Sequence, residues 1–172
     1  VLWRLIYTCR LVIPMNPSTI PTLDEYRTLT GEIRDQVAQV PGVTAVARTL
    51  TAPFQFTGGG KCCWGQVVEA PENAEDLIRL SMHPVDAAYF DATGTRILAG
   101  GVWTESTTYE APYPVVINES LAIRFFGSAG AAIGRSLPNQ DEFAHEIVAV
   151  ANDTRHYGLD SETDVAMYLP YE

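Results

Sequence analysis

The histidines are the first side chains to consider for chemistry in this chain. His83, His145 and His156 lie in unrelated segments and show no ligand spacing such as His-x-x-x-His. His83 precedes Pro84 at an expected turn, and His145 opens an expected strand. We therefore predict solvated or hydrogen-bonded surface histidines, with neither a metal nor a catalytic role for any of them.

The cysteines could supply a nucleophile or a disulfide. Cys9, Cys62 and Cys63 are odd in number, and the adjacent pair would strain the peptide between them if they were bonded to each other. A zinc site would want four regularly spaced ligands, and the chain has no Cys-x-x-Cys. A bridge from Cys9 to Cys62 or Cys63 and three free thiols both stay open. An enzyme that uses Cys62 or Cys63, activated by the neighbouring Lys61, is one hypothesis.

Two further patterns are incomplete versions of chemical motifs. Residues 57–61 read TGGGK but lack the first glycine of a phosphate-binding loop and the Ser or Thr after its lysine, so a flexible loop is predicted. Ser120 lies in an Asn-Glu-Ser sequence and not in a Gly-x-Ser-x-Gly elbow. We predict no catalytic residue, no cofactor and no metal site.

Carboxylates gather in two places, and neither matches a calcium loop. We predict solvated loops for both groups. Asp153 and Arg155 form a more specific pair, because residues i and i+2 at the end of a strand share a face. We predict that this pair anchors the next turn by hydrogen bonds. The two carboxylate groups are Glu69, Glu72, Glu75 and Asp76, and Asp160, Glu162 and Asp164.

Composition limits the class of protein. The 172 residues are enough for one or two small domains, and 47% hydrophobic with 19% charged residues is typical of a folded protein. A net charge of −10 with only 11 Lys and Arg argues against nucleic acid and against anionic membrane surfaces as partners.

Hydrophobic runs in the chain are short. None reaches the roughly 18–20 residues of a membrane span, and the longest, over residues 2–13, is interrupted by Arg4 and Arg10. No signal peptide is recognisable, and the chain starts with Val1. We therefore expect an excised domain of a larger protein.

The first 50 residues are predicted to form a β-α-β unit. Apolar and polar residues alternate over 5–13, as in a strand with one buried face. Thr22 and Glu25 form a capping box for a helix over 23–40 with one apolar face. Residues 43–50, rich in Val and Thr, are predicted to be the second strand.

The remainder is predicted to consist of short strands with little helix. Asn118 is expected to cap a helix over 120–126 that Gly127 ends, and a single helical turn is expected over 85–90. Residues 146–151 are apolar on both faces, which favours a central strand. The predicted strands cover 66–69, 77–82, 98–103, 115–117, 146–151 and 166–169.

The stretch from Val115 to Pro170 supports the most specific interpretation. It contains INESLAIRFFG (117–127), IGRSL (133–137), NDTRHYGL (152–159) and YLP (168–170), and it follows QVPGVTAVA (39–47) and DAAYFDATGTRILAGGVWTE (86–105). This ordered series resembles the extracytoplasmic, or periplasmic core, domain of MacB-like and FtsX-like ABC transporter permeases. The family-motif positions, for which the resemblance implies structural roles, are Asn118, Glu119, Arg124, Phe125, Gly134, Asp153, Arg155, Gly158 and Pro170.

The resemblance implies an α+β fold in two parts. A discontinuous porter-like β-α-β subdomain would comprise residues 1–55 and 145–172, and a mixed α+β subdomain would be inserted at 56–144. Transmembrane helices of the same protein would precede residue 1 and follow residue 172, in a bacterial inner membrane with this domain on the periplasmic side. An ABC ATPase would lie elsewhere, so this domain would not be an enzyme.

Function is likewise an expectation from the resemblance. The domain would transmit ATP-driven conformational change to a periplasmic substrate or adaptor, in efflux or mechanotransmission. The C-terminal block favours the duplicated, adaptor-less branch, and we expect the isolated domain to be a monomer. The alternative is a periplasmic solute- or peptide-binding module, with residues 57–65 as a lid over a pocket lined by Trp64, Trp103 and Tyr109.

Overall fold

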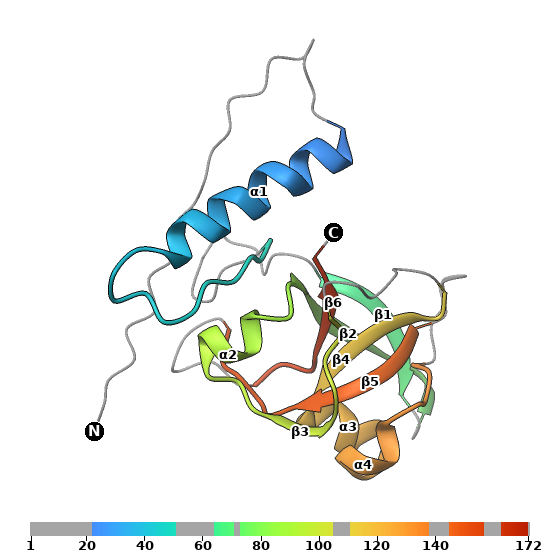
Figure 1. The fold of residues 1–172 in the computed structure, drawn as a ribbon. Helices are drawn as coiled ribbons and strands as arrows, with labels where there is room; N and C mark the ends of the chain where they lie inside the picture. The colour runs from blue at the N-terminus through green and yellow to red at the C-terminus, as the bar shows by residue number, and fades with distance from the viewer. Residues whose placement is uncertain are drawn as a thin grey trace.

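One mixed β-sheet forms the body of the protein (Figure 1). The computed structural model describes residues 22–50, 64–70, 73–104, 111–137, 145–156 and 163–171. The sheet has six strands in the order β1-β2-β6-β4-β5-β3, so the fold is α+β as predicted. The strands are β1 (Trp64–Ala70), β2 (Asn73–Val85), β3 (Ile97–Gly100), β4 (Tyr113–Asn118), β5 (His145–Ala151) and β6 (Ala166–Pro170).

The sheet combines parallel and antiparallel pairs. β2 and β6 are parallel, from Ser81 opposite Ala166 to Val85 opposite Pro170, and β4 and β5 are also parallel. The β1–β2, β4–β6 and β3–β5 pairs are antiparallel. β5 therefore lies inside the sheet, as its two apolar faces predicted.

Strands from both sides of the predicted subdomain boundary lie in this one sheet. β1 to β4 fall within residues 56–144, whereas β5 and β6 fall within 145–172. The division into a porter-like part and an inserted part stays a prediction, and the expected strand over 5–13 lies outside the described residues.

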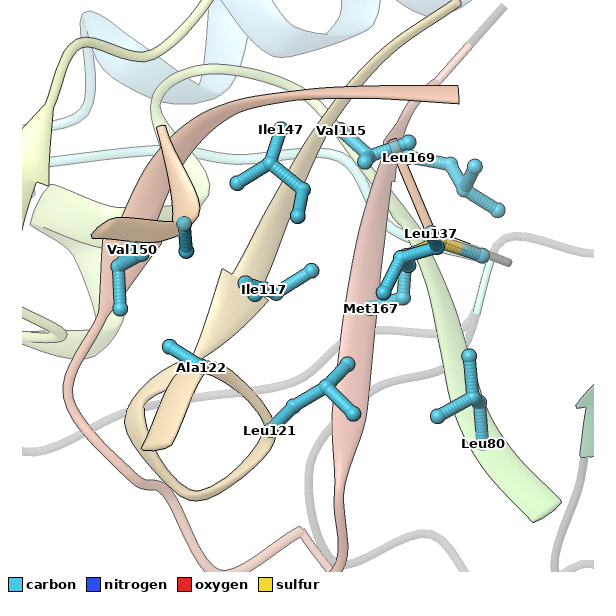
Figure 2. Packing of buried hydrophobic residues seen from close by; sticks show 11 residues of the cluster. Leu80, Val115, Ile117, Leu121, Ala122, Leu137, Ile147, Val150, Met167 and Leu169 are labelled. Carbon is cyan, nitrogen blue, oxygen red and sulfur yellow. The ribbon is translucent and has the colours of Figure 1, made fainter. Parts of the chain in front are cut away.

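Both faces of the sheet carry a hydrophobic cluster. Val115 and Ile117 of β4 point to one face, and Val116 between them points to the other, as the period of two in a strand requires. Figure 2 shows the first cluster, in which Leu121 and Ala122 of helix α3 (Glu119–Phe126) join side chains from the strands. The residues of this cluster are Leu80, Val115, Ile117, Leu121, Ala122, Ala132, Leu137, Ile147, Val150, Met167 and Leu169.

Helix α3 begins and ends where the sequence predicted. The Asn118 side chain accepts a hydrogen bond from the Leu121 amide, and Gly127 ends the helix in the left-handed conformation with φ of 79°. The Thr22–Glu25 capping box of α1 is also present. The helices are α1 (Leu23–Ala38), α2 (Tyr89–Thr93), α3 (Glu119–Phe126) and α4 (Ala129–Ala132), the last of which was not predicted.

The predicted strand over 43–50 is wrong. Only Thr49 pairs, as an isolated bridge with Val85 at the end of β2. The residue before Val85 is Pro84, which would pair with Leu50 if the strand continued. The Pro84 carbonyl accepts from the Leu50 amide, but Pro84 has no N–H to donate in return. On the other side, the Asp86 carboxylate takes the Arg48 amide hydrogen. The pairing of residues 43–50 with β2 therefore cannot extend in either direction from the Thr49–Val85 bridge.

The ends of two strands also differ from prediction. β2 continues through Val85, so the helical turn expected over 85–90 forms later, as α2. β3 ends at Gly100 and not at residue 103, because Gly100 adopts a φ of 74°. Glu75 and Asp76, expected in a solvated loop, instead lie in β2, whereas Glu69 lies in β1 within the strand expected over 66–69.

Candidate functional site

Asn118 joins four segments of the chain. Its side-chain oxygen accepts hydrogen bonds from the amides of Leu121 and Ala166, at 3.3 and 2.9 Å. Its side-chain nitrogen donates to an Asp153 carboxylate oxygen at 2.7 Å and to the Asp164 carbonyl at 2.9 Å. The buried amide thereby uses both donors and both acceptor positions.

Asp153 completes this junction. Its carboxylate also accepts from the Ser120 amide at 3.0 Å and the Ser120 hydroxyl at 2.6 Å. A carboxylate in this place is favoured by the unpaired amides and the dipole at the start of α3. Asp153 therefore anchors α3, whereas we predicted that it would anchor the turn after β5. Arg155 is exposed.

The other family-motif positions are spread over the molecule. Of the nine, the described hydrogen bonds bring Asn118 and Asp153 together, and Gly158 lies outside the described residues. Glu119 opens α3, and Arg124 is exposed on it, while Phe125 packs against the first core cluster. Gly134 donates its amide to the Ile147 carbonyl at 2.8 Å, and Pro170 ends β6. Their roles in the family stay predictions.

The prediction of surface histidines is wrong for all three. His83, His145 and His156 are buried. The rings of His83 and His156 stack with 3.9 Å between centroids, and His156 Nε2 lies 3.0 Å from the Tyr168 hydroxyl. His83 is not in a turn, because β2 extends past it and pairs it with Tyr168 of β6.

Burial keeps this histidine pair neutral at ordinary pH. Burial lowers the pKa of His83 to about 3, and the neighbouring His156 adds to that effect. Burial lowers the pKa of His156 to about 4, although Asp164 acts in the opposite direction. Burial also raises the pKa of the Tyr168 hydroxyl to about 12.

The Tyr168 ring contacts both histidines and connects them to other aromatic rings on the second face of the sheet. Phe90 meets Tyr168 and Trp103 edge to face, with 5.3 and 6.1 Å between centroids. Trp103 is thus part of the core, and the pocket expected for a binding module stays a prediction. The other expected lining groups, the Trp64 side chain and Tyr109, are not among the parts of the chain that the structure describes. No motif in the sequence signalled this cluster, because its members come from distant segments.

Other chemical candidates can be located only in part. Cys9, Cys62, Cys63 and the loop over 57–65, apart from the backbone of 64 and 65 in β1, fall outside the described residues. Within the described segments, no group of three or more His, Cys, Asp or Glu side chains could hold a metal ion. No helix in those segments is long and apolar enough to span a bilayer.

One solved structure of a transporter domain shares this fold. The periplasmic region of MacB from Actinobacillus actinomycetemcomitans aligns with a TM-score of 0.51 and 14% identity, over 81% of this chain and 54% of that one. A domain of a putative permease protein from Porphyromonas gingivalis aligns with a TM-score of 0.46 and 19% identity, over 78% of this chain and 54% of that one.

A third solved structure is the extracellular domain of the noncanonic ABC-type transporter YknZ from Gram-positive bacteria. It aligns with a TM-score of 0.46 and 14% identity, over 81% of this chain and 61% of that one. The chain thus spans between half and two thirds of each of these three structures. No curated protein matches it.

Structural likeness at such low identity shows the fold alone, and the family rests on the sequence. The sequence model of the MacB-like periplasmic core domain matches residues 10–172, nearly the whole chain. That match covers the blocks at 39–47, 86–105 and 114–170 from which the resemblance was drawn. The chain belongs to the MacB-like periplasmic core domain family.

Proposed function

We propose that this chain is the extracytoplasmic domain of an ABC transporter permease and transmits ATP-driven conformational change to a periplasmic substrate or partner. The observation that carries the proposal is the family match over residues 10–172. Transmembrane helices of the parent protein would connect to the domain, and a separate nucleotide-binding domain or subunit would hydrolyse ATP.

The described structure supports a mechanical role. Transmission of a displacement needs elements that move together. The junction of buried Asn118 with half-buried Asp153 ties the ends of β4 and β5 to the starts of α3 and β6. Hydrogen bonds to charged groups inside a protein are among the stronger ones, so this junction should resist shear between those elements.

Within that function we favour the duplicated, adaptor-less branch of the permeases. The support is the C-terminal block over 114–170, which reads more like that branch than like exporters that work with an adaptor. Efflux of a substrate through an adaptor is the other form of the same proposal.

Coupling in the parent transporter tests the proposal. Residues 1–172 would be replaced by a short flexible linker in the intact transporter, and ATP hydrolysis and substrate movement would be measured in the same vesicles. We expect ATP hydrolysis to persist while movement of the substrate is lost. Unchanged substrate movement would contradict a transmitting role.

A further inference from the structure

Helix α1 differs from the other long helix in how it meets the sheet. α3 covers the first core cluster, with Leu121 and Ala122 fully buried. α1 instead lies beyond the end of β6, off the body of the sheet (Figure 1). Leu29 and Val37, on α1, are 38% and 42% exposed. Among the described residues, polar side-chain contacts connect α1 to the end of the sheet.

Those contacts meet where β2 and β6 end. The Tyr171 amide donates to the Val85 carbonyl at 2.9 Å, which keeps the residue after β6 beside the end of β2. Two hydrogen bonds join the Arg48 main chain to Asp86. The Arg48 amide donates to the Asp86 carboxylate at 2.8 Å, and the Arg48 carbonyl accepts from the Asp86 amide at 3.0 Å. Arg48 and Tyr171 are thus fixed to the sheet through their main chains.

The Arg48 guanidinium reaches three segments from this position. It lies 5.5 Å from the centre of the Tyr171 ring, and its Nε is 3.4 Å from the Asp86 carboxylate. Its Nη1 donates to the Thr30 hydroxyl of α1 at 3.2 Å. The same hydroxyl donates to the Tyr26 carbonyl at 2.9 Å, so Thr30 can accept from Arg48 without losing its helical bond.

Tyr171 makes the second contact with α1. Its hydroxyl lies 2.6 Å from the Tyr26 hydroxyl, one turn before Thr30. Two side chains held by the end of the sheet therefore bind two consecutive turns of the helix. We call these four residues, Tyr26, Thr30, Arg48 and Tyr171, the α1 latch.

We propose that the α1 latch is a releasable joint, and that α1 separates from the sheet as a unit when the chain after Pro170 is displaced. Tyr171 supplies both the ring beneath Arg48 and the hydroxyl that meets Tyr26, so moving this one residue breaks the Tyr26 contact and removes the ring that supports the Arg48 guanidinium against Thr30. Side-chain hydrogen bonds of this kind are individually weak, and segments held by few of them open without global unfolding.

This proposal adds a moving part to the proposed function. It depends on that function only for the purpose of the motion, not for the existence of the joint. In a permease, the chain that follows Tyr171 would lead towards the membrane, so a displacement there would release or seat α1. The joint itself is tested on this chain alone, and its failure would leave the transport assignment untouched.

Two matched threonine substitutions in α1 test the joint. Thr28 and Thr30 each donate a hydroxyl to a carbonyl four residues earlier, but Thr30 also accepts from Arg48. We would measure hydrogen–deuterium exchange of the α1 amides in Thr30→Val, with Thr28→Val as the control. Thr30→Val should exchange about 10-fold faster or more across α1 than the control, with β4 and β5 unchanged, as expected for one lost bond to a charged group.

Two tyrosine substitutions test the other contact without touching Arg48. Tyr26→Phe and Tyr171→Phe remove the same hydrogen bond, so each should speed α1 exchange equally, by about 2- to 5-fold, and the double variant should exchange no faster than either. Equal exchange in Thr30→Val and Thr28→Val would overturn the proposal. So would an α1 that exchanges without protection in the unaltered chain, or one that exchanges only together with β4 and β5.

Discussion

At the scale of single residues, Asn118 shows how a motif position can be structural. The sequence predicted its role as a helix cap, and that role is confirmed. The bonds to Asp164 and Ala166 could not be predicted, because those residues lie 46 and 48 positions away and the fold alone brings them near. The sequence shows what this side chain can do locally and not which distant backbone groups it satisfies.

Removing the Asn118 amide should be costly. Asn118→Ala leaves the Ala166 and Leu121 amides without their acceptor in a buried place, so we expect about 3 kcal/mol less stability. Urea unfolding measures this. Asn152→Ala is the control, since Asn152 is only half-buried and makes two described side-chain bonds, and about 1 kcal/mol is expected there. Equal losses in the two variants would argue against the junction.

The buried histidines predict an unusual loss of stability in mild acid. In the unfolded chain His83 and His156 protonate near 6.5, whereas in the folded chain their pKa values are about 3 and about 4. As pH falls below about 6.5, the unfolded state therefore binds protons that the folded state does not. Each histidine should lower stability by up to about 1.4 kcal/mol per pH unit until its folded pKa is reached.

Replacing one histidine isolates this effect. The free energy of unfolding of His83→Phe, measured by urea between pH 7.5 and 5, should fall with acid less steeply than that of the unaltered chain. At pH 7.5 both histidines are neutral in either state, so any difference there reports packing alone. A pH slope that is the same in the two proteins would show that His83 does not stay neutral when folded.

At the scale of elements, the sequence predicted the features that depend on residues close together in the chain. The caps of α1 and α3 and the interior position of β5 follow from residue types at short spacing. The prediction of a strand over 43–50 was wrong because it rested on composition alone. Pro84 and the Asp86 carboxylate prevent that segment from pairing further with β2. Those partners are distant in sequence, so propensity could not reveal them.

Gly100 is an element boundary that only glycine fits. Its φ is 74°, and a Cβ there would meet the Val148 carbonyl oxygen, as well as Ile133 Cδ1 at 2.9 Å and Ala149 Cα at 3.0 Å. Gly127 has a similar φ of 79° but nothing within 4 Å of such a Cβ. Gly127→Ala should cost about 1 kcal/mol through its backbone conformation alone, and Gly100→Ala at least about 2 kcal/mol more.

Thermal and urea unfolding of these two variants separate strain from clash. The difference in unfolding free energy between Gly100→Ala and Gly127→Ala reports the contact between β3 and β5, because both variants share the left-handed backbone. If the two alanines cost the same, the close approach of β3 to Val148 would not exist in solution.

At the scale of the whole molecule, the sequence predicted the fold class and the family better than the order of the strands in the sheet. The α+β class and the family were apparent from the ordered blocks of sequence, and the family match covers residues 10–172. The strand order was not apparent, since the positions of β6 between β2 and β4 and of β3 at the edge depend on long-range pairing. The buried His83–His156 pair depends on the same pairing, which is why the sequence showed three unrelated histidines.

The assembly state belongs to this scale as well. We predict that the isolated chain is a monomer at micromolar concentration, because the membrane part and the ATPase would supply much of the dimer contact in a complete transporter. Light scattering should therefore give a mass near 18.8 kDa. A stable mass of twice that value would show that the domain dimerises without them.

The central claim is that this domain stands outside a membrane as part of a permease. Sequencing the gene on both sides of the region that encodes residues 1–172 tests it most directly. We expect a span of about 20 apolar residues shortly before Val1 and a cluster of three such spans after Glu172. Flanks without such spans, or a cleavable signal peptide as the sole hydrophobic segment, would contradict it.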